Sequence, residues 1–163
     1  MGELGFALAD SVNGVYQISE EHLSECAGLY VRVFNSAPWN DQWTVESAYR
    51  RLRDIYLSPG FIGVLFLEDR RVKAAVMGNC EEWFEGRHFN LREMFVDTEL
   101  QGKTIGSKIL TELEIRLKEL GVRTVILFTS KENRTNSFYR KNGFYELDSM
   151  AMMTKDIQTG LGV

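Results

Sequence analysis

The sequence has little cysteine, proline or histidine, and these shortages exclude several classes of protein. Its 163 residues include only two cysteines, two prolines and two histidines. Cys26 and Cys80 stand in no metal-binding or redox spacing, so the fold does not rest on disulfides and a cytoplasmic location is expected. Met1 to Asp10 lacks both a basic leader and an apolar run long enough for export or membrane spanning. We therefore expect a short frayed terminus and no membrane partner.

The sequence also lacks a cluster of metal ligands and an excess of positive charge, and each absence makes one class of function less expected. His22 and Cys26 lie four residues apart on a predicted helix, but two ligands do not make a zinc site, so no metal is expected. Lysine and arginine total 19 against 23 aspartates and glutamates, which gives a formal net charge of -4. A protein that binds nucleic acid would usually show a basic excess, and that partner is therefore not expected.

What the chain does have is enough apolar material for one core. Hydrophobic residues make up 44% of the sequence and aromatic residues 12%, in a chain whose length suits one domain. No repeat or linker divides residues 1–163, which we expect to fold as a single domain.

The order of strand and helix patterns predicts an α+β fold with a sheet of mixed direction. Apolar alternation and turn residues predict strands at Val12–Ser19, Phe61–Leu67, Arg71–Cys80, His88–Val96, Val122–Phe128 and Phe144–Met153. Helical spacing and capping residues predict helices at Ser19–Asn35, Thr44–Leu57, Ile105–Leu120 and Asn133–Lys141.

The stretch from Leu91 to Leu120 joins a strand, a glycine-containing turn and an amphipathic helix. The turn is Gln101-Gly102-Lys103-Thr104-Ile105-Gly106, and the helix follows at once. Helix starts carry unpaired backbone N–H groups and the positive end of the helix dipole, so this turn can bind an anion such as phosphate. Alternatively, the glycines only form a tight turn and the hydroxyl of Thr104 caps the helix.

A P-loop for nucleoside triphosphates is a competing interpretation of the same turn, because Gly102-Lys103-Thr104 completes the end of that motif. A P-loop needs a glycine five residues before Gly102, where this chain has Asp97. The next predicted strand is followed by Thr129 rather than by the aspartate that a nucleotide triphosphatase uses around magnesium. The context therefore disfavours a P-loop.

Two segments resemble the signatures of one family. Gln101–Gly106 resembles the Q/R-x-x-G-x-G/A turn of the GNAT superfamily of acetyl-CoA-dependent N-acetyltransferases, with Thr104 in place of the first glycine. One helix and one strand later, Ser137–Phe144 closely resembles the F-Y-x-K-x-G-F segment of that family. The resemblance runs from about Val12 to Asp156. It implies the GNAT fold, with a mixed central sheet of six to seven strands flanked by about four helices.

The same resemblance implies acetyl-CoA as co-substrate. In that family the turn binds the CoA pyrophosphate, which here concerns Gln101, Gly102, Lys103, Thr104, Ile105, Gly106 and Ser107. The strand before the turn splays from its neighbour in the family, and its backbone pairs with the pantetheine arm at Met94, Phe95 and Val96. Further cofactor contacts are carried over to Asn133, Asn136 and Tyr139.

Two residues are candidates for catalysis. Tyr139 matches the tyrosine that the family places at the CoA sulfur, and a phenol of pKa about 10 can protonate a leaving thiolate. Glu93 resembles the glutamate that some members use as a general base through water. Strand alternation predicts that Leu91, Glu93 and Phe95 share one face, where apolar neighbours would raise the pKa of the carboxyl. A core tyrosine, and a salt bridge from Glu93 to Arg92 or Arg87, are the structural alternatives.

Two aromatic loops are candidates for binding the acceptor. Trp39 and Trp43 lie between the first two predicted helices, where they either anchor the loop or line an acceptor pocket. Glu82 and Trp83 lie between two predicted strands among other acidic and aromatic residues. That loop either attracts an ammonium group by charge and cation–π contact or is a solvated hairpin tip.

The predicted function is transfer of an acetyl group from acetyl-CoA to a primary amine of a small molecule or peptide. Attack is expected to be direct, in a ternary complex, because neither cysteine falls on a motif position. The alternative is a catalytically weak CoA-binding or protein-interaction module on the same fold. Tyr139 and Glu93 favour the enzyme, since a binding module has no chemical need for them. The acceptor's identity stays open, and a homodimer is one of the assemblies left open.

Overall fold

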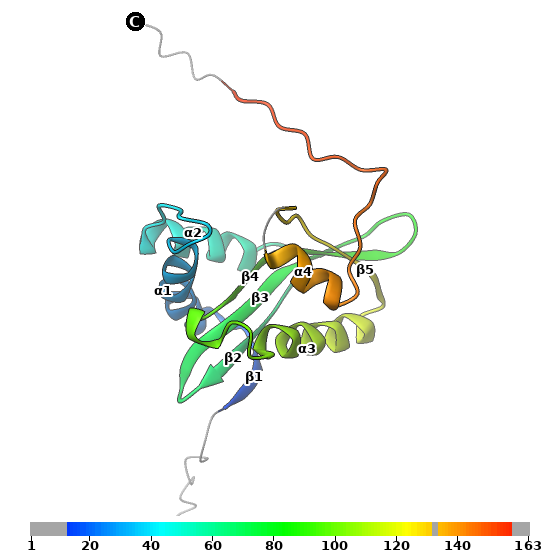
Figure 1. The fold of residues 1–163 in the computed structure, drawn as a ribbon. Coiled ribbons are helices and arrows are strands. Elements are labelled where there is room, and N and C mark those ends of the chain that lie inside the picture. Colours follow the sequence, from blue (N-terminus) through cyan, green and yellow to red (C-terminus); the bar gives the residue numbers. More distant parts are fainter. Residues whose placement is uncertain (1–12, 132–133, 158–163) are drawn as a thin grey trace, which may run out of the picture. The chain divides into compact units, whose positions relative to one another are not determined.

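A computed structural model describes residues 13–131 and 134–157 (Figure 1). It divides into two compact units, one ending at Phe128 and one beginning at Thr129, which are described separately. The expectation for Met1 to Asp10 lies outside the described residues.

The first unit holds the sheet and most of the helices. Its elements are β1 (Gly14–Gln17), the 3-10 helix η1 (Glu20–His22), α1 (Leu23–Phe34), α2 (Val45–Tyr56), β2 (Phe61–Glu68), β3 (Arg71–Glu81), β4 (Arg87–Val96), the 3-10 helix η2 (Thr98–Leu100), α3 (Ile105–Glu119) and β5 (Val122–Ile126). The second unit holds α4 (Arg134–Lys141).

The sheet has mixed direction, as predicted. Its strand order is β1-β2-β3-β4-β5, with antiparallel pairs up to β4 and a parallel pair between β4 and β5. Helix α3 makes the crossover between these two parallel strands, a connection that normally requires a helix. Helices α1 and α2 cover one face of the sheet and α3 covers the other (Figure 1).

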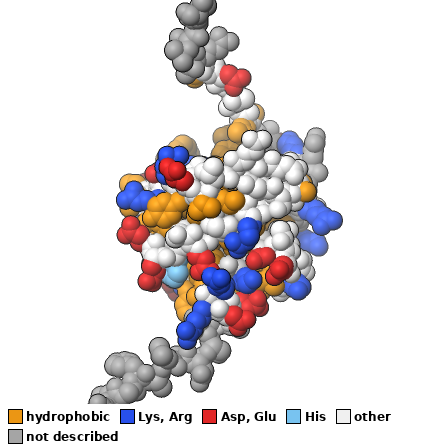
Figure 2. Space-filling view, turned by 90° about the vertical axis from the view of Figure 1, so that its left-hand side faces the viewer, with side chains coloured by type: hydrophobic (Ala, Val, Ile, Leu, Met, Phe, Trp, Pro, Cys, Tyr) orange, Lys and Arg blue, Asp and Glu red, His pale blue; other side chains and the backbone are white. Residues whose placement is uncertain are grey.

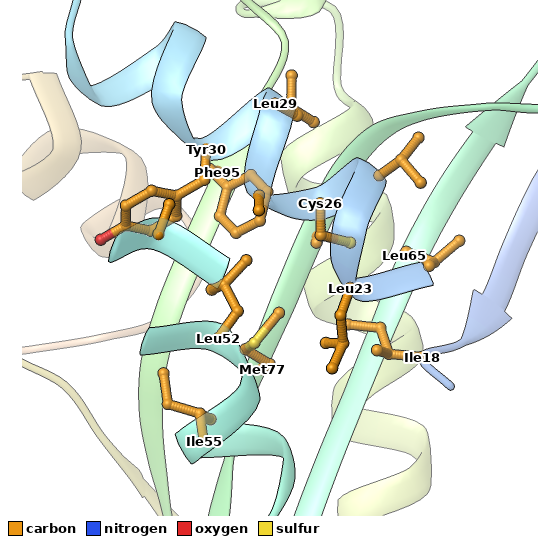
Figure 3. Packing of buried hydrophobic residues seen from close by; sticks show 14 of the residues in the cluster. Ile18, Leu23, Cys26, Leu29, Tyr30, Leu52, Ile55, Leu65, Met77 and Phe95 are labelled. Atoms are coloured by element: carbon orange, nitrogen blue, oxygen red, sulfur yellow. The ribbon is translucent and has the colours of Figure 1, made fainter. Parts of the chain in front are cut away.

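The larger part of the core lies between the sheet and helices α1 and α2. Its members include Leu23 and Tyr30 of α1, Leu52 of α2 and Met77 of β3 (Figure 3). Strand side chains alternate between the two faces of the sheet, so the residues next to each core residue of a strand point to the opposite face, which α3 covers. The buried stripe of that helix consists of Ile109, Leu110, Leu113 and Leu117.

A β-bulge in β4 changes which side chains share a face. Glu93 pairs with Met77, but the next residue of β3, Gly78, pairs with Leu91, so Arg92 is an extra residue. Paired residues of antiparallel strands point to the same side, and Met77 belongs to the core under α1 and α2. Glu93 therefore faces these two helices. The prediction that Leu91 shares this face is wrong because the bulge turns it to the α3 side; Phe95 does share the face of Glu93.

The number of strands is a second correction. The sheet of the described residues has five strands rather than six to seven, and the predicted strand from Phe144 to Met153 is absent. The apolar pattern of that segment predicted a strand, but a strand also needs a hydrogen-bonded neighbour. In the described residues the segment has none, and most of its large apolar side chains are exposed.

The surface bears charges of both signs. Acidic and basic side chains are interspersed on the face shown in Figure 2, in keeping with the small net charge of -4. Within residues 13–131 and 134–157, no helix is both long and apolar enough to cross a membrane.

Gly78 tests the importance of the bulge. A Cβ atom on this residue would lie 1.9 Å from the carbonyl oxygen of Asn90 and 2.8 Å from Cζ of Phe89. We expect Gly78→Ala to lower the free energy of unfolding by about 1–3 kcal/mol or more, because the two strands must move apart. Urea denaturation followed by circular dichroism measures this loss.

Gly28→Ala is the matched control. This glycine lies inside α1, where an added Cβ would meet only the Arg32 guanidinium at 3.7 Å. The control should be neutral or more stable by up to about 1 kcal/mol, since alanine favours helices. Equal stability of Gly78→Ala and the wild type would contradict the close approach of β3 and β4.

Candidate functional site

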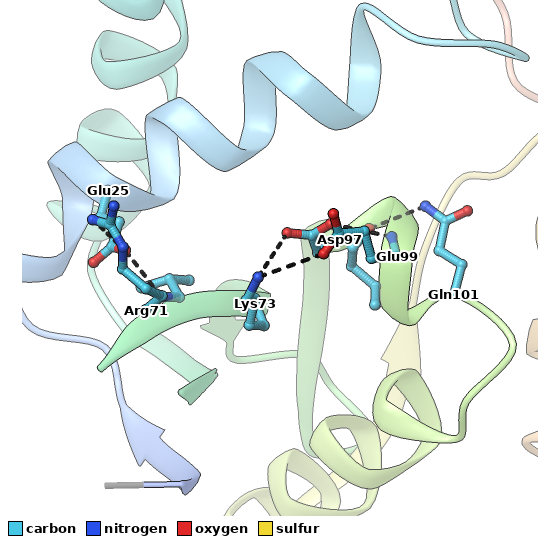
Figure 4. A network of polar contacts seen from close by, with 8 residues as sticks. Glu25, Arg71, Lys73, Asp97, Glu99 and Gln101 are labelled. Atoms are coloured by element: carbon cyan, nitrogen blue, oxygen red, sulfur yellow. Dashed lines mark hydrogen bonds and ion pairs between the residues drawn. The ribbon is translucent and has the colours of Figure 1, made fainter. Parts of the chain in front are cut away.

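The turn between β4 and α3 is tied to the end of the strand. Asp97 is buried and its carboxylate accepts a hydrogen bond from the N–H of Glu99 at 3.2 Å. Lys73 of β3 lies 3.5 Å from the same carboxylate, as Figure 4 shows. Gln101 donates from Nε2 to the carbonyl oxygen of Val96 at 3.0 Å. The side chain of Gln101 therefore ties the turn to the end of β4. Helix α3 begins a few residues later, at Ile105.

Thr104 has a backbone conformation that favours glycine. Its φ is 68° and its ψ is -4°, which is the left-handed region, and Gly102 also has a positive φ of 79°. The hydroxyl of Thr104 makes no capping hydrogen bond, so the capping alternative is not realised. A side chain in this region costs about 1–2 kcal/mol, and a β-branched residue is rare there. The backbone at Thr104 thus has a conformation that glycine would adopt without this cost.

The start of α3 is suited to an anion. The first N–H groups of a helix have no acceptor within it, here those of Ile105, Gly106 and Ser107. The first turn contains no acidic side chain, so the positive end of the dipole of this 15-residue helix is not neutralised there. The start of α3 can therefore offer several aligned backbone N–H donors to a phosphate.

The strand that leads to this turn separates from β5. Pairing of β4 with β5 runs from Arg87 to Asn90, the latter opposite Ile126, and goes no further. Asp97 donates its N–H to the carbonyl oxygen of Lys73 at 2.7 Å. Alternation along an antiparallel ladder then directs the backbone groups of Phe95 to β3, and those of Met94 and Val96 to the side that β5 has left.

Glu93 lies in the middle of β4 in a buried polar cluster. Its side chain accepts two hydrogen bonds on the same oxygen, Oε1, one from Nε of Arg51 and one from the hydroxyl of Tyr30 at 3.2 Å. Arg51 comes from α2 and Tyr30 from α1. The predicted salt bridge of Glu93 thus exists, but with Arg51 instead of Arg92 or Arg87.

The environment of Glu93 raises the pKa of its carboxyl. The residue is only 8% exposed, and burial raises the pKa of its carboxyl more than the Arg51 guanidinium and the Tyr30 hydroxyl lower it. Burial and the negative charge of Glu93 also raise the pKa of Tyr30, so this phenol stays protonated and remains a donor. Glu93 can therefore exchange a proton near neutral pH more readily than an exposed glutamate.

Trp39 and Trp43 anchor their loop, and Trp43 also reaches the Glu93 cluster. The Trp39 ring lies 5.7 Å from that of Phe34, and the Trp43 ring meets Tyr30 edge-on at 5.2 Å. Trp43 donates its indole N–H to Asp41 at 3.0 Å. An open hollow of about 450 Å³ lies beside it, lined by Asp41, Gln42, Trp43 and Ser47. Trp43 thus connects a surface hollow with the residue that binds Glu93.

Glu82 and Trp83 lie apart from this cluster, at the other end of β4. Glu82 forms an ion pair with Arg87 at 2.6 Å, and Trp83 stacks on His88 at 5.8 Å while remaining 56% exposed. His88 precedes Glu93 by five residues, or about 17 Å of extended strand. The hairpin is therefore not brought together with Trp43 and Glu93.

Tyr139 lies in the second unit, on α4. It is 9% exposed, and its ring meets that of Phe144 edge-on at 5.4 Å. Asn136, one turn earlier, donates to Glu146 at 3.2 Å and accepts from Arg140 at 2.7 Å. Both its predicted role and that of Tyr139 remain predictions, and Asn133 lies outside the described residues.

Neither cysteine has an activated thiol, because burial raises the pKa of both Cys26 and Cys80. Burial raises the pKa of Cys26 to about 12, so its thiol is a poor nucleophile. His22 accepts the N–H of Ser19 on Nδ1 at 3.0 Å and thereby stabilises the start of the first helical segment. Across the described ranges, no three His, Cys, Asp or Glu side chains are grouped as metal ligands would be.

Sequence reasoning missed Arg51 and Tyr30 as site residues. Tyr30 falls on the apolar stripe of α1 and therefore looks like any core aromatic. Arg51 lies three residues after Ala48 and four before Ile55, both buried, which places it at the edge of the buried stripe of α2. An arginine at such a margin was the available signal, because a charge there needs a buried partner.

Comparison with protein families identifies the chain. Residues 58–146, more than half of its length, match the family model described as acetyltransferase (GNAT) domain. The chain belongs to the GNAT acetyltransferase family. The match begins just before β2 and includes both the turn at Gln101–Gly106 and α4. A search of curated proteins found none that matches.

Solved structures described as acetyltransferases share the fold of this GNAT member at low sequence identity. A possible acetyltransferase from Clostridium difficile 630 has a TM-score of 0.75 at 15% identity and covers 89% of this chain and 98% of its own. The aminoglycoside N-acetyltransferase AAC(6')-Iy in complex with CoA has a TM-score of 0.72 at 14% identity, with 92% and 99% covered. Glucosamine-6-phosphate N-acetyltransferase from Arabidopsis thaliana has 0.63 at 21%, with 89% and 98% covered.

The backbone of Thr104 generates a prediction about stability. We expect Thr104→Gly to raise the free energy of unfolding by about 1 kcal/mol, because glycine adopts a positive φ without the steric cost of a Cβ atom. Chemical denaturation measures the change. Thr104→Ala is the control, since it removes the hydroxyl but keeps the Cβ atom and should gain much less. A stability of Thr104→Gly below that of the wild type would show that the threonine side chain has a stabilising contact.

Proposed function

We propose that this GNAT protein is an acetyl-CoA-dependent N-acetyltransferase acting on a primary amine of a small molecule or peptide. Residues 1–163 act as one acetyltransferase domain, and transfer occurs by direct attack in a ternary complex. The inertness of the buried Cys26 supports transfer without an acyl-enzyme, because a covalent route would need an activated nucleophile.

The observation that carries this proposal is the separation of β4 from β5 after Asn90. An extended ligand can pair with the strand edge left by β5, which is how peptides and other linear groups add to sheets. The same strand carries Glu93 and ends at the phosphate-binding turn. A thioester whose arm follows β4 and whose pyrophosphate lies at the start of α3 would have its reactive end near the middle of the strand. Two of the structural neighbours, both AAC(6')-Iy, were solved with CoA or a CoA-containing analogue, which supports this choice of ligand.

Glu93 is the proposed general base. The amine must lose a proton before it attacks the thioester carbonyl, and a carboxylate of raised pKa can accept that proton directly or through one water molecule. Oε1 already holds two donors, so Oε2 is the atom that takes the proton. A backbone N–H of Met94 or Val96 would stabilise the negative charge that develops on the thioester oxygen.

Tyr139 is the proposed general acid. When the carbon–sulfur bond breaks, the thiolate of CoA takes the phenolic proton. The second proton that the amine nitrogen loses on becoming an amide restores the phenol, and Glu93 releases the first proton to solvent. The proposal rests on the match of Ser137–Phe144 to the family segment.

The acceptor is proposed to bind beside Trp43. The hollow lined by this indole and Asp41 offers an aromatic surface and a carboxylate, both of which attract an ammonium group. Trp39 holds the loop in place by packing against Phe34. Glu82 and Trp83 would contact only an acceptor long enough to reach the far end of β4.

A catalytically weak CoA-binding or interaction module is the second candidate. The strained backbone of Thr104 favours it, because selection for tight phosphate binding would favour glycine at this position. Turnover distinguishes the two candidates. Acetylation of any polyamine, aminoglycoside or lysine-containing peptide supports the enzyme, and CoA binding without turnover supports the module.

Binding of CoA is the first prediction of the proposal. Calorimetric titration of the protein with CoA and acetyl-CoA should give one site of micromolar affinity. Ser107→Glu should weaken this binding by about tenfold or more, because a carboxylate in the first turn repels the pyrophosphate. Thr111→Glu is the control, with the same charge change on an exposed position farther along α3. Equal affinities of the two variants would contradict a pyrophosphate site at the helix start.

The role of Tyr139 gives a second prediction. Tyr139→Phe should lower kcat by about 100-fold or more, the usual contribution of a general acid, while the Kd for CoA changes little. Tyr145→Phe, on a side chain that is 79% exposed, should leave kcat unchanged. A parallel loss of CoA affinity in Tyr139→Phe would show that the hydroxyl binds the cofactor and does not act as the acid.

A further inference from the structure

Two residues outside the strand and its turn bind the proposed base. Nε of Arg51 and the hydroxyl of Tyr30 both donate to Oε1 of Glu93, from α2 and α1. The arginine side chain is 36% exposed and the glutamate side chain 9%, so the pair is partly sealed from water. Tyr30 is itself held in place by the rings of Phe95 and Trp43, at 5.3 and 5.2 Å. The Tyr30 donor is therefore held by its aromatic neighbours.

The two donors leave the second oxygen of the carboxylate available. Oε2 accepts no hydrogen bond within the described residues. In the same part of the chain, Arg116 Nε is the one side-chain polar atom that is fully buried and unpartnered, so Oε2 is not sealed from solvent. An incoming proton can therefore reach this atom and not the other.

From this geometry we propose that Arg51 and Tyr30 are positioning residues, which hold Oε1 of Glu93 and present Oε2 to the proton of the acceptor amine. This inference rests on the proposed role of Glu93 as base. Neither residue touches the reacting atoms in this account, and each acts through the carboxylate.

Arg51 also favours the ionised form of the carboxylate. The groups that face Glu93 are Arg51 from α2, Tyr30 from α1 and Arg92 on its own strand, while its partner on β3 is the uncharged Met77. Burial raises the pKa of the carboxyl, and the Arg51 guanidinium lowers it more than any other neighbour does. Without Arg51 the base would be protonated, and therefore inactive, over more of the neutral range.

Stability alone does not explain the arrangement. A buried ion pair rarely stabilises a fold more than apolar side chains of similar size would, because both charges lose their hydration. A site that must hold one carboxylate oxygen and leave the other open does need such a pair. A positioning role requires both donors to bind the same carboxylate oxygen. A purely structural ion pair would not require this.

The test uses two readouts on the full-length protein. The first is the titration of the Glu93 side-chain carboxyl by ¹³C NMR without any substrate, with the signal assigned by its loss in Glu93→Gln. The second is the pH dependence of kcat/KM with acetyl-CoA and the best acceptor among a polyamine, an aminoglycoside and a lysine-containing peptide. The variants are Arg51→Gln, Arg51→Lys and Tyr30→Phe. Arg50→Gln is the control, because this neighbouring arginine is exposed and, within the described residues, its ion pair is with Glu46 alone.

We expect Arg51→Gln to raise the pKa of the Glu93 carboxyl by about 1 unit or more, because an adjacent opposite charge lowers such a pKa by about 1–3 units. The acid limb of kcat/KM should move to higher pH by the same amount. Tyr30→Phe should shift the carboxyl pKa and the acid limb in the same direction by a smaller amount. Arg51→Lys keeps the positive charge, so it should return the acid limb close to its wild-type pH while recovering less of the wild-type kcat/KM. Arg50→Gln should change neither readout. Tyr30→Phe keeps the ring packing, so it tests the idea even where Arg51→Gln folds poorly.

The two readouts separate this inference from the proposed function. An unchanged NMR titration in Arg51→Gln overturns the inference, whatever the kinetics show. A shifted titration with an unmoved acid limb overturns it as well. Absence of acetyl transfer from the wild type, or an acid limb that survives in Glu93→Gln, instead shows that the proposed base role is wrong.

Discussion

The rest of the site depends on the β-bulge that makes Arg92 an extra residue in β4. Gly78 permits the bulge, because any side chain on it would collide with the backbone of Asn90. The extra residue turns Glu93 towards α1 and α2 while Leu91 turns to α3. Pairing with β5 ends just before this point, so one local irregularity coincides with the buried carboxylate and with the opening beside it.

Burial of Glu93 creates a cost that its neighbours must offset. Without these partners the pKa of the carboxyl would be raised further, since desolvation disfavours the charged form. Arg51 supplies an opposite charge and Tyr30 a neutral donor, and both bind the same oxygen. Trp43 extends this cluster to the surface hollow. The acceptor side of the proposed reaction is thus built from the two helices and the loop between them, and the cofactor side from β4 and α3.

Local sequence patterns were enough to predict most of the first unit. Helices α1, α2 and α3 and all five strands lie where periodicity and turn residues predicted them, with ends differing by a few residues. The turn at Gln101–Gly106 was predictable because its glycines and the helix start are adjacent in sequence. The positive φ of Thr104 was not predicted, since threonine itself indicates the opposite preference.

What sequence could not predict depends on contacts between distant segments. The bulge follows from the register of β3 on β4, which alternation within one strand does not contain. The partner of Glu93 lies 42 residues away on α2, and nothing near either residue indicates that they meet. The expected strand from Phe144 has the right composition, but its formation depends on a partner edge. Trp83 was grouped with Trp43 by chemistry alone, and strand length separates them.

The central claim is that β4 and the start of α3 together bind acetyl-CoA. Hydrogen exchange of the backbone amides, measured with and without saturating acetyl-CoA, tests it most directly. We expect slower exchange at Met94 and Val96 and at Ile105–Ser107, with little change at the hairpin tip around Trp83. Binding that leaves these amides unchanged and protects other segments would contradict it.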